Sequence, residues 1–260
     1  MATSLFKKLF TNKKPIIGML HIFGDTMHKQ IQHVLHDLEL LQLHVDGVLI
    51  ENYGWGYQNQ NRAEEYAKNQ ITEITYRVME KSLIPVGINL LPNDYEKAFD
   101  ICSKTGARFI QLDHITGRFK HCASVSPSHF ISVRKKYPRV VVLGGIHPKY
   151  YRLTNPETPI EQSALRAKRL AHAIVVTGEK TGGAATIEDL ARVKCTIGNK
   201  PLIIGSGLTP QNAIAQLSIA DGAIVGSAFK THGVSYGSPI NPTLVKNLMA
   251  QVARLRHNPA

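Results

Sequence analysis

Eight short aliphatic runs, each bounded by turn-forming residues, restrict the fold of this chain more than any other feature. The runs are rich in Val and Ile and apolar on both alternating faces, as strands buried in a parallel sheet must be. Their starts lie on average roughly 30 residues apart, the size of one strand–helix unit. They cover residues 15–20, 46–51, 85–90, 107–112, 140–145, 172–177, 201–206 and 221–226. The pattern predicts eight parallel strands.

The segments between the runs carry helical signals. Ile31, Leu35, Leu38 and Leu41 recur at steps of three and four residues, which predicts one apolar stripe along a helix. Other segments open with a residue that caps helices, followed by Pro at the first helical position or by an acidic residue three positions on. These predicted starts are Ser126 with Pro127, Thr186 with Asp189, Thr209 with Pro210, and Asn241 with Pro242.

Eight repeated strand–helix units predict an α/β protein that forms a single-domain (β/α)8 barrel, or TIM barrel. A doubly wound open sheet is the alternative. It needs fewer strands or an antiparallel edge, and its phosphate-binding glycines usually follow the first strand. No linker rich in Pro, Gly or Ser divides the chain, so we expect one domain over residues 1–260.

Residues 1–14 read as a basic, amphipathic N-terminal extension of that domain. Its apolar side chains fall on one side of a short helix, and Lys7 and Lys8 lie opposite them. A helix of this kind can touch a membrane surface, but we expect it to close the bottom of the barrel. The apolar residues are Leu5, Phe6, Leu9 and Phe10.

The composition is that of a globular cytoplasmic protein. Hydrophobic residues make up 43% and charged residues 19% of 260 residues, which excludes a disordered chain. No run approaches the ~20 apolar residues of a membrane span, and lysines interrupt the N-terminus too early for a secretory signal. Cys102, Cys122 and Cys195 show no paired spacing, which favours a reducing compartment. We also expect a homo-oligomer, the commonest state of soluble assemblies.

The net charge of +12 predicts an attraction to anions. Part of the charge is clustered, as in the stretch "RKKYPR" from Arg134 to Arg139. A solvated basic surface is the simplest interpretation. Peripheral contact with an acidic membrane or with nucleic acid is the alternative, although neither interleaved aromatic residues nor a nucleic-acid-binding module is present.

Two neighbouring runs end in the same Gly-Ser pair. Gly205, Ser206 and Gly207 follow the seventh run, and Gly226 and Ser227 follow the eighth. The loops after strands 7 and 8 of such barrels often hold phosphate. Glycine lets backbone N–H groups approach the anion, and serine adds a hydroxyl group. We therefore expect a phosphate-binding barrel whose ligand is a small phosphorylated metabolite.

With these segments in place, the chain resembles the BtpA family from about Lys14 to Leu248. The most specific matching stretches are "IGMLH", "DGVLIENYG" and the pair "GSG" and "GSA". The resemblance implies a single-domain TIM barrel, and the family is named for a member linked to photosystem I biogenesis. Two positions depart from the family pattern, because Trp55 and Gly145 stand where relatives usually carry an acidic residue.

Polar residues stand at the ends of six consecutive predicted strands, where barrel enzymes carry their catalytic groups. Such residues seldom finish a buried strand unless they face a pocket or a partner. We expect a ligand pocket formed by His21, Glu51, Asn52, Asn89, Asp113, His114, His147, Lys149, Thr177 and Gly178.

Within this set Glu51 is the first candidate for a general base, because burial can raise the pKa of a carboxyl group. Asp113 or His147 would supply the complementary acid, and Lys149 would neutralise a carboxylate or a second phosphate. Glu51, Asp113 and His21 are also residue types that bind a divalent metal, so a metal cofactor remains open. The glycine-rich stretch "TGEKTGGAA" is either a surface connection or a lid.

Two functions remain in competition. The first is an enzyme that isomerises or cleaves a small phosphorylated substrate by proton transfer, for which the paired Gly-Ser loops and polar strand ends are the reason. The second is a non-catalytic assembly or membrane-biogenesis factor, for which the basic N-terminus and the missing acids are the reason.

Overall fold

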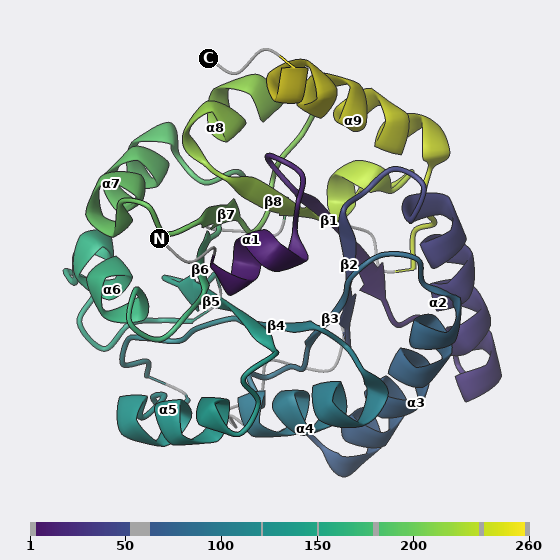
Figure 1. Ribbon diagram of the computed structural model, residues 1–260, viewed down its shortest axis with the longest axis horizontal. Coiled ribbons are helices and arrows are strands. Elements are labelled where there is room, and N and C mark those ends of the chain that lie inside the picture. The colour runs from purple at the N-terminus through teal and green to yellow at the C-terminus, as the bar shows by residue number, and fades with distance from the viewer. Residues whose placement is uncertain are drawn as a thin grey trace.

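The computed structural model describes residues 4–52, 63–120, 122–149, 151–178, 182–233 and 237–257. Within them, parallel strands pair in chain order and close into a barrel, with β8 hydrogen-bonded to β1 (Figure 1). The strands are β1 (Ile16–His21), β2 (Gly47–Glu51), β3 (Val86–Asn89), β4 (Phe109–Leu112), β5 (Val141–Ile146), β6 (Ala173–Val176), β7 (Leu202–Ile204) and β8 (Gly222–Val225). The predicted single-domain (β/α)8 barrel is confirmed, and the open sheet is excluded.

Helices form a ring around the barrel and carry the chain from the end of one strand to the start of the next (Figure 1). The ring contains α2 (Met27–Leu41), α3 (Glu65–Lys81), α4 (Tyr95–Thr105), α5 (Pro127–Lys135), α6 (Ile160–Ala167), α7 (Ile187–Ile197), α8 (Ala213–Ile219) and α9 (Pro242–His257). A single 3₁₀ turn, η1 (Ser227–Phe229), follows β8.

Both faces of the strands are buried, which explains why the runs are apolar without interruption. In β1, Ile16 and Leu20 pack against the outer helices, whereas Ile17 and Met19 point into the barrel. Because side chains alternate along a strand, His21 continues the inward series at the end of β1. This alternation decides which strand-end residues can reach the central pocket.

Helix α1 (Leu5–Leu9) closes the N-terminal end of the barrel, as the sequence predicted. Figure 1 shows it lying across the barrel centre. Phe6 and Phe10 are 3% and 4% exposed, and the Phe10 ring meets the ring of Phe109 edge-on at 5.4 Å. Gly47 is required here, because a Cβ on it would lie 2.9 Å from the Phe10 ring.

Two helix predictions need correction. Helix α8 begins at Ala213, not after Pro210, because the Asn212 side chain accepts the Thr209 N–H and holds residues 209–212 in a turn. In α2 the fully buried face contains Val34, Leu38 and Leu41 together with polar Gln30 and Asp37, whereas Ile31 and Leu35 are only partly buried.

We predict that Phe10→Ala lowers the free energy of unfolding by about 3–4 kcal/mol, because it opens a cavity beside Phe109 in the barrel interior. Chemical denaturation measures the change. Lys8→Ala removes an exposed side chain of α1, two residues before Phe10, and serves as the control. Equal effects of the two substitutions would show that α1 does not contribute to the core.

Candidate active site

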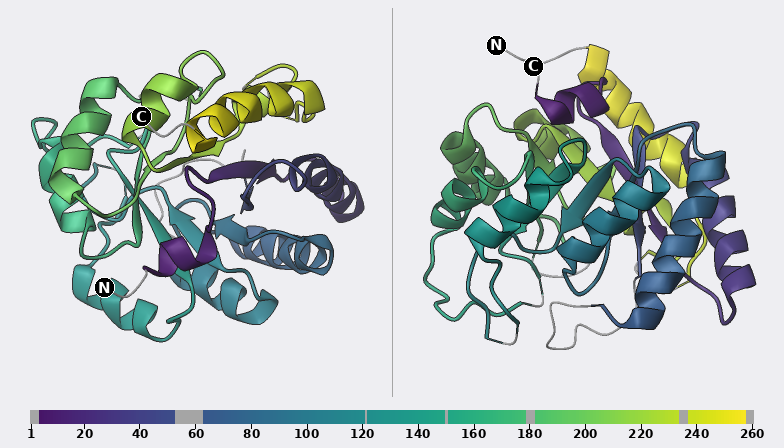
Figure 2. Two further views of the ribbon diagram at one scale, coloured as in Figure 1. Left: turned by 45° about the horizontal axis from the view of Figure 1, so that its top comes forward. Right: turned by 60° about the horizontal axis from the view of Figure 1, so that its bottom comes forward.

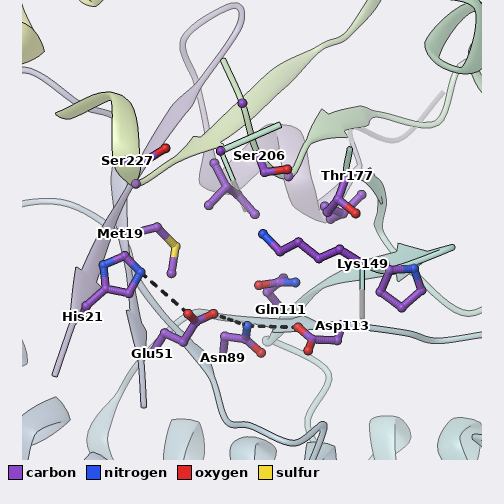
Figure 3. Close-up of a pocket in the computed structure, with 18 of the residues that line it drawn as sticks. Met19, His21, Glu51, Asn89, Gln111, Asp113, Lys149, Thr177, Ser206 and Ser227 are labelled. Carbon is purple, nitrogen blue, oxygen red and sulfur yellow. Dashed lines mark hydrogen bonds and ion pairs between the residues drawn. The ribbon is translucent and has the colours of Figure 1, made fainter. Parts of the chain in front are cut away.

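A pocket lies at the carboxyl ends of the strands, at the opposite end of the barrel from α1 (Figure 3). Its cavity of about 100 Å³ has room for several water molecules, which suits a small polar group better than a polymer. The lining combines polar residues at strand ends with the glycine-rich loops that follow β7 and β8. It includes Met19, His21, Glu51, Asn89, Gln111, Asp113, Gly145, Lys149, Val175, Thr177, Gly205, Ser206, Gly207, Ile224, Gly226, Ser227 and Lys230.

His21 is held as a neutral ring by a lysine that the sequence analysis did not select. The Lys230 Nζ lies 2.7 Å from His21 Nδ1. An ammonium group can only donate, so Nδ1 accepts and the ring proton resides on Nε2. Burial, together with the positive charges of Lys230 and Lys149, lowers the pKa of His21 to about 3. His21 therefore presents a neutral N–H donor to the pocket.

Glu51 faces that donor across the pocket floor. Its Oε1 lies 3.7 Å from His21 Nε2, and its side chain is 13% exposed. Burial and the nearby Asp113 carboxylate raise its pKa to about 7, although a hydrogen bond from Asn89 opposes the rise. A carboxyl group that exchanges its proton near neutral pH can serve as a general base or acid.

The amide of Asn89 connects the two acidic side chains of the pocket (Figure 3). Its Nδ2 donates to Glu51 Oε2 at 2.6 Å and to Asp113 Oδ1 at 3.3 Å. Asp113 also accepts a hydrogen bond from the Tyr151 hydroxyl at 3.1 Å. Burial raises the pKa of Asp113, and these two hydrogen bonds oppose that rise. One amide thus fixes the distance between the two carboxyl groups.

The glycine-rich loops that follow β7 and β8 form the side of the pocket opposite the carboxyl groups. Gly207 has φ +75°, and a Cβ on it would lie 2.3 Å from backbone atoms of Gly183 and Ala184. The Ser206 hydroxyl accepts from Gly178 N–H at 3.3 Å and donates to the Gly183 carbonyl at 3.1 Å, so it ties the loop after β6 to the loop after β7. Both Ser206 and Ser227 line the same pocket.

Two further polar groups of the pocket have unused hydrogen-bonding capacity. The Thr177 hydroxyl is buried without a hydrogen-bond partner among the described residues. The Lys149 side chain crosses the pocket between the carboxyl groups and the serines (Figure 3), and within the described chain its ammonium forms no ion pair with a carboxylate. A buried hydroxyl without a partner is costly, and a half-buried ammonium without an ion pair attracts an anion, so both groups favour a site that receives a polar ligand.

Four predicted site residues do not line the pocket. Asn52, His114 and Gly178 each follow an inward-facing residue by one position and point away. Asn52 is bonded twice to the Leu91 backbone, and Gly178 donates to Ser206. His114 packs against Phe119 and Tyr151, and its Nε2 lies 3.6 Å from Cys122 Sγ.

His147 is the fourth of these residues. It has φ +45°, and its Nε2 lies 3.0 Å from the Ser163 hydroxyl of α6. The turn carries its ring out of the pocket and towards the helix, where burial lowers its pKa.

Sequence reasoning missed Met19, Gln111, Lys230 and Tyr151. Met19 and Gln111 lie two residues before His21 and Asp113, so the alternation of the strands could have identified them. Lys230 lies beyond η1, and Tyr151 beyond a turn after β5. Their positions depend on loop geometry that no local pattern reveals.

Of the two positions that depart from the family pattern, Gly145 and Trp55, the structure describes only Gly145. A Cβ on Gly145 would lie 2.0 Å from the Asp113 carbonyl oxygen, so this backbone excludes any acidic side chain there. Trp55 lies outside the described residues, as does part of the glycine-rich stretch after β6. Among the residues that the structure describes, no three His, Cys, Asp or Glu side chains are grouped to hold a metal ion.

Fold and site together define a TIM barrel with a polar pocket at the carboxyl ends of its strands. The chain belongs to the BtpA family, whose model matches residues 12–254. An uncharacterised protein of Pyrococcus furiosus is 28% identical and aligns with 87% of this chain and 90% of its own length. The photosystem I biogenesis protein BtpA of Synechocystis is 26% identical, over 94% of this chain and 90% of its own length.

Among solved structures, N-(5'-phosphoribosyl)anthranilate isomerase from Pyrococcus furiosus is similar with a TM-score of 0.60. The match covers 93% of this chain and 99% of that chain at 17% sequence identity. This likeness shows the shared fold.

The raised pKa of Glu51 predicts a pH-dependent gain in stability for Glu51→Gln. At acidic pH the carboxyl is protonated in both the folded and the unfolded state, and its burial carries no ionisation penalty. The penalty grows as the unfolded state ionises above pH ~4.5 and is complete above the folded-state pKa of about 7. We expect Glu51→Gln to gain on the order of 2–3 kcal/mol more at pH 8 than at pH 4.

Urea denaturation at both pH values measures this difference. Glu39→Gln, at an exposed glutamate of α2, is the matched control and should show no such difference. A pH-independent effect of Glu51→Gln would contradict the raised pKa.

Proposed function

We propose that the protein is an enzyme that binds a small phosphorylated metabolite and transfers a proton within it. Isomerisation or a lyase-like carbon–carbon cleavage is the reaction class that we favour. The observation that carries the proposal is the Glu51 carboxyl, with a pKa near 7, facing a neutral His21 N–H in one pocket. Perturbed acidic groups in a cleft are typical of catalytic sites.

The phosphate group would occupy the side formed by the exits of β7 and β8. Ser227 and Gly207 line the pocket there, and backbone N–H groups of these turns would donate to the phosphate oxygens. Neither Gly207 nor Ser227 donates its backbone N–H to a hydrogen bond within the described residues. Lys149 would add a positive charge between the phosphate and the reacting carbons.

The proton transfer would use the other side of the pocket. The Glu51 carboxylate removes a proton from the carbon next to a carbonyl group, and the His21 Nε2–H donates a hydrogen bond to the carbonyl oxygen as negative charge develops on it. Glu51 then returns the proton to the former carbonyl carbon, while the proton of the hydroxyl group on the first carbon passes to the former carbonyl oxygen through His21 Nε2, so that the carbonyl and hydroxyl groups exchange places. Lys230 keeps His21 neutral and correctly oriented, and Asn89 positions Glu51. No metal ion takes part in this proposal.

A purely structural assembly factor is less well supported by this pocket. Burying two carboxyl groups around one amide destabilises the fold, and a scaffold has no use for that arrangement.

Binding tests the phosphate part of the proposal. We expect Ser227→Asp to weaken the binding of ribose 5-phosphate and glycerol 3-phosphate at least 10-fold, because it places a negative charge beside the phosphate group. Ser218→Asp adds the same charge on the exposed side of α8 and should bind like wild type. Calorimetric titration supplies both affinities. Absence of binding to wild type, or equal loss in both variants, would contradict the assignment.

Hydrogen exchange tests the catalytic part. Phosphorylated α-hydroxycarbonyl compounds incubated with the protein in D₂O should exchange the proton next to the carbonyl, as followed by NMR. We expect the exchange rate to fall as pH drops below about 7, where Glu51 becomes protonated, and Glu51→Gln to lose at least 10³-fold with binding retained. Exchange that survives this substitution would refute Glu51 as the base.

A further inference from the structure

Helix α2 buries a carboxylate that neither the packing of the fold nor the proposed reaction has yet explained. Asp37 is 0% exposed, and no side chain of the described residues forms a hydrogen bond with either of its oxygens. His33 Nε2, one turn earlier in α2, lies 3.5 Å from Asp37 Oδ2. Burial raises the pKa of Asp37, and the nearby His33 and Lys230 oppose the rise. A carboxylate buried with so little compensation destabilises the fold.

Other buried aspartate side chains of the described chain have clear structural roles. Asp94 caps α4 by accepting the Lys97 N–H at 3.2 Å. Asp46 accepts the Ile16 N–H at 2.7 Å and so joins the start of β1 to the start of β2. Such hydrogen bonds offset the loss of water around a carboxylate. Asp37 has no comparable bond from a side chain or a helix terminus, so we looked for a charge that it serves.

Lys230 is the buried cation that needs this charge. It is 6% exposed, and its Nζ donates to His21 Nδ1 at 2.7 Å. Within the described chain it forms no direct ion pair with a carboxylate. Burial lowers the pKa of Lys230, and the carboxylates of Asp37 and Glu51 oppose that change, with Asp37 contributing more. A buried ammonium depends on such counter-charges to keep its proton.

The fold places these two counter-charges on different sides of Lys230. An isolated antiparallel bridge to Ile240 ties Lys230 to the segment just before α9. Helix α2 packs against β1, which carries His21, and it contacts α9. Figure 2 (left) shows α2 (purple) and α9 (yellow) as neighbours in the outer ring. Asp37 therefore lies on the helix side of Lys230, whereas Glu51 lies on its pocket side.

The two carboxylates differ in what happens to them during the proposed reaction. Glu51 takes up the proton of the substrate and becomes neutral, so Lys230 loses that counter-charge at the moment when negative charge develops on the substrate oxygen. Asp37 lies outside the pocket lining and keeps its charge. The ammonium of Lys230 polarises the His21 ring through Nδ1 and strengthens Nε2–H as a donor to that oxygen. The reaction therefore needs Lys230 to stay charged.

We propose that Asp37 is a positioning residue, the permanent counter-ion that keeps Lys230 charged and bonded to His21 while Glu51 changes its charge. This proposal rests on the proton transfer proposed above, but the charge of Lys230 can be measured without a substrate. The titratable groups that face Lys230 are His21 of β1, Glu51 of β2 and Asp37 of α2, with His33 beside Asp37.

A ¹³C NMR titration of the Lys230 Cε carbon in the ligand-free protein, assigned with Lys230→Met, tests the charge. We expect Asp37→Asn, which keeps the shape of the side chain, to lower the midpoint by about one pH unit. Asp37→Ser, a smaller neutral side chain, should give the same shift. Asp46→Asn removes a buried carboxylate at the opposite end of the barrel and should leave the midpoint unchanged. Thermal unfolding establishes that each variant is folded. An unchanged midpoint in both Asp37 variants, or an equal shift in Asp46→Asn, would overturn the proposal.

The D₂O exchange assay tests how Asp37 acts. Asp37→Asn should keep the loss of rate below about pH 7 that Glu51 causes. It should add a loss of about 10-fold at the alkaline pH where Lys230 is neutral in the variant but charged in wild type. In a Lys230→Met background, Asp37→Asn should have no further effect. Additive losses would show that Asp37 acts independently of Lys230 and would overturn its assignment. Absence of exchange in wild type would refute the proposed reaction, and the NMR titration would still decide whether Asp37 holds the charge of Lys230.

Discussion

The pairing of β8 with β1 is the constraint on which the rest of the structure depends. Ile16, Ile17 and Gly18 of β1 align with Ala223, Ile224 and Val225 of β8 and close the sheet. Closure brings Lys230 to His21 across 209 residues of chain. It also sets the glycine-rich loops after β7 and β8 across the pocket from the polar residues that end β2 to β4. Without it, neither side of the pocket would face the other.

The packing of the closed barrel offsets the destabilising burial of polar groups in the pocket. Apolar side chains fill the barrel interior below the pocket, and α1 seals the opposite end. Above them, Glu51 and Asp113 share the amide of Asn89, and burial keeps the pKa of both carboxyl groups raised although that amide opposes the rise. Their position at strand ends holds these groups rigidly, and the buried Glu51 carboxyl keeps a pKa of about 7, as the proposed proton transfer requires.

Much of this arrangement could be predicted from the sequence, because the two-residue alternation of a strand is a local property. It places His21, Glu51, Asn89, Asp113 and Thr177 on the inward face, and the structure puts each of them in the pocket. The same alternation, applied one residue further, explains why Asn52, His114 and Gly178 point away. Lys230, Tyr151 and His147 could not be placed, because turns after the strands determine where their side chains lie. The start of α8 was missed because the side chain of Asn212 folds back on the turn.

The central proposal is that Glu51 titrates near neutral pH in a pocket that binds a phosphate group on its opposite side. The most direct measurement is a ¹³C NMR titration of the Glu51 carboxyl carbon, assigned with Glu51→Gln, in the free protein and with glycerol 3-phosphate. The account predicts a midpoint near pH 7 in the free protein and a higher midpoint with the ligand, because the phosphate adds negative charge nearby. A midpoint near the ordinary glutamate value of about 4.3, unchanged by the ligand, would contradict it.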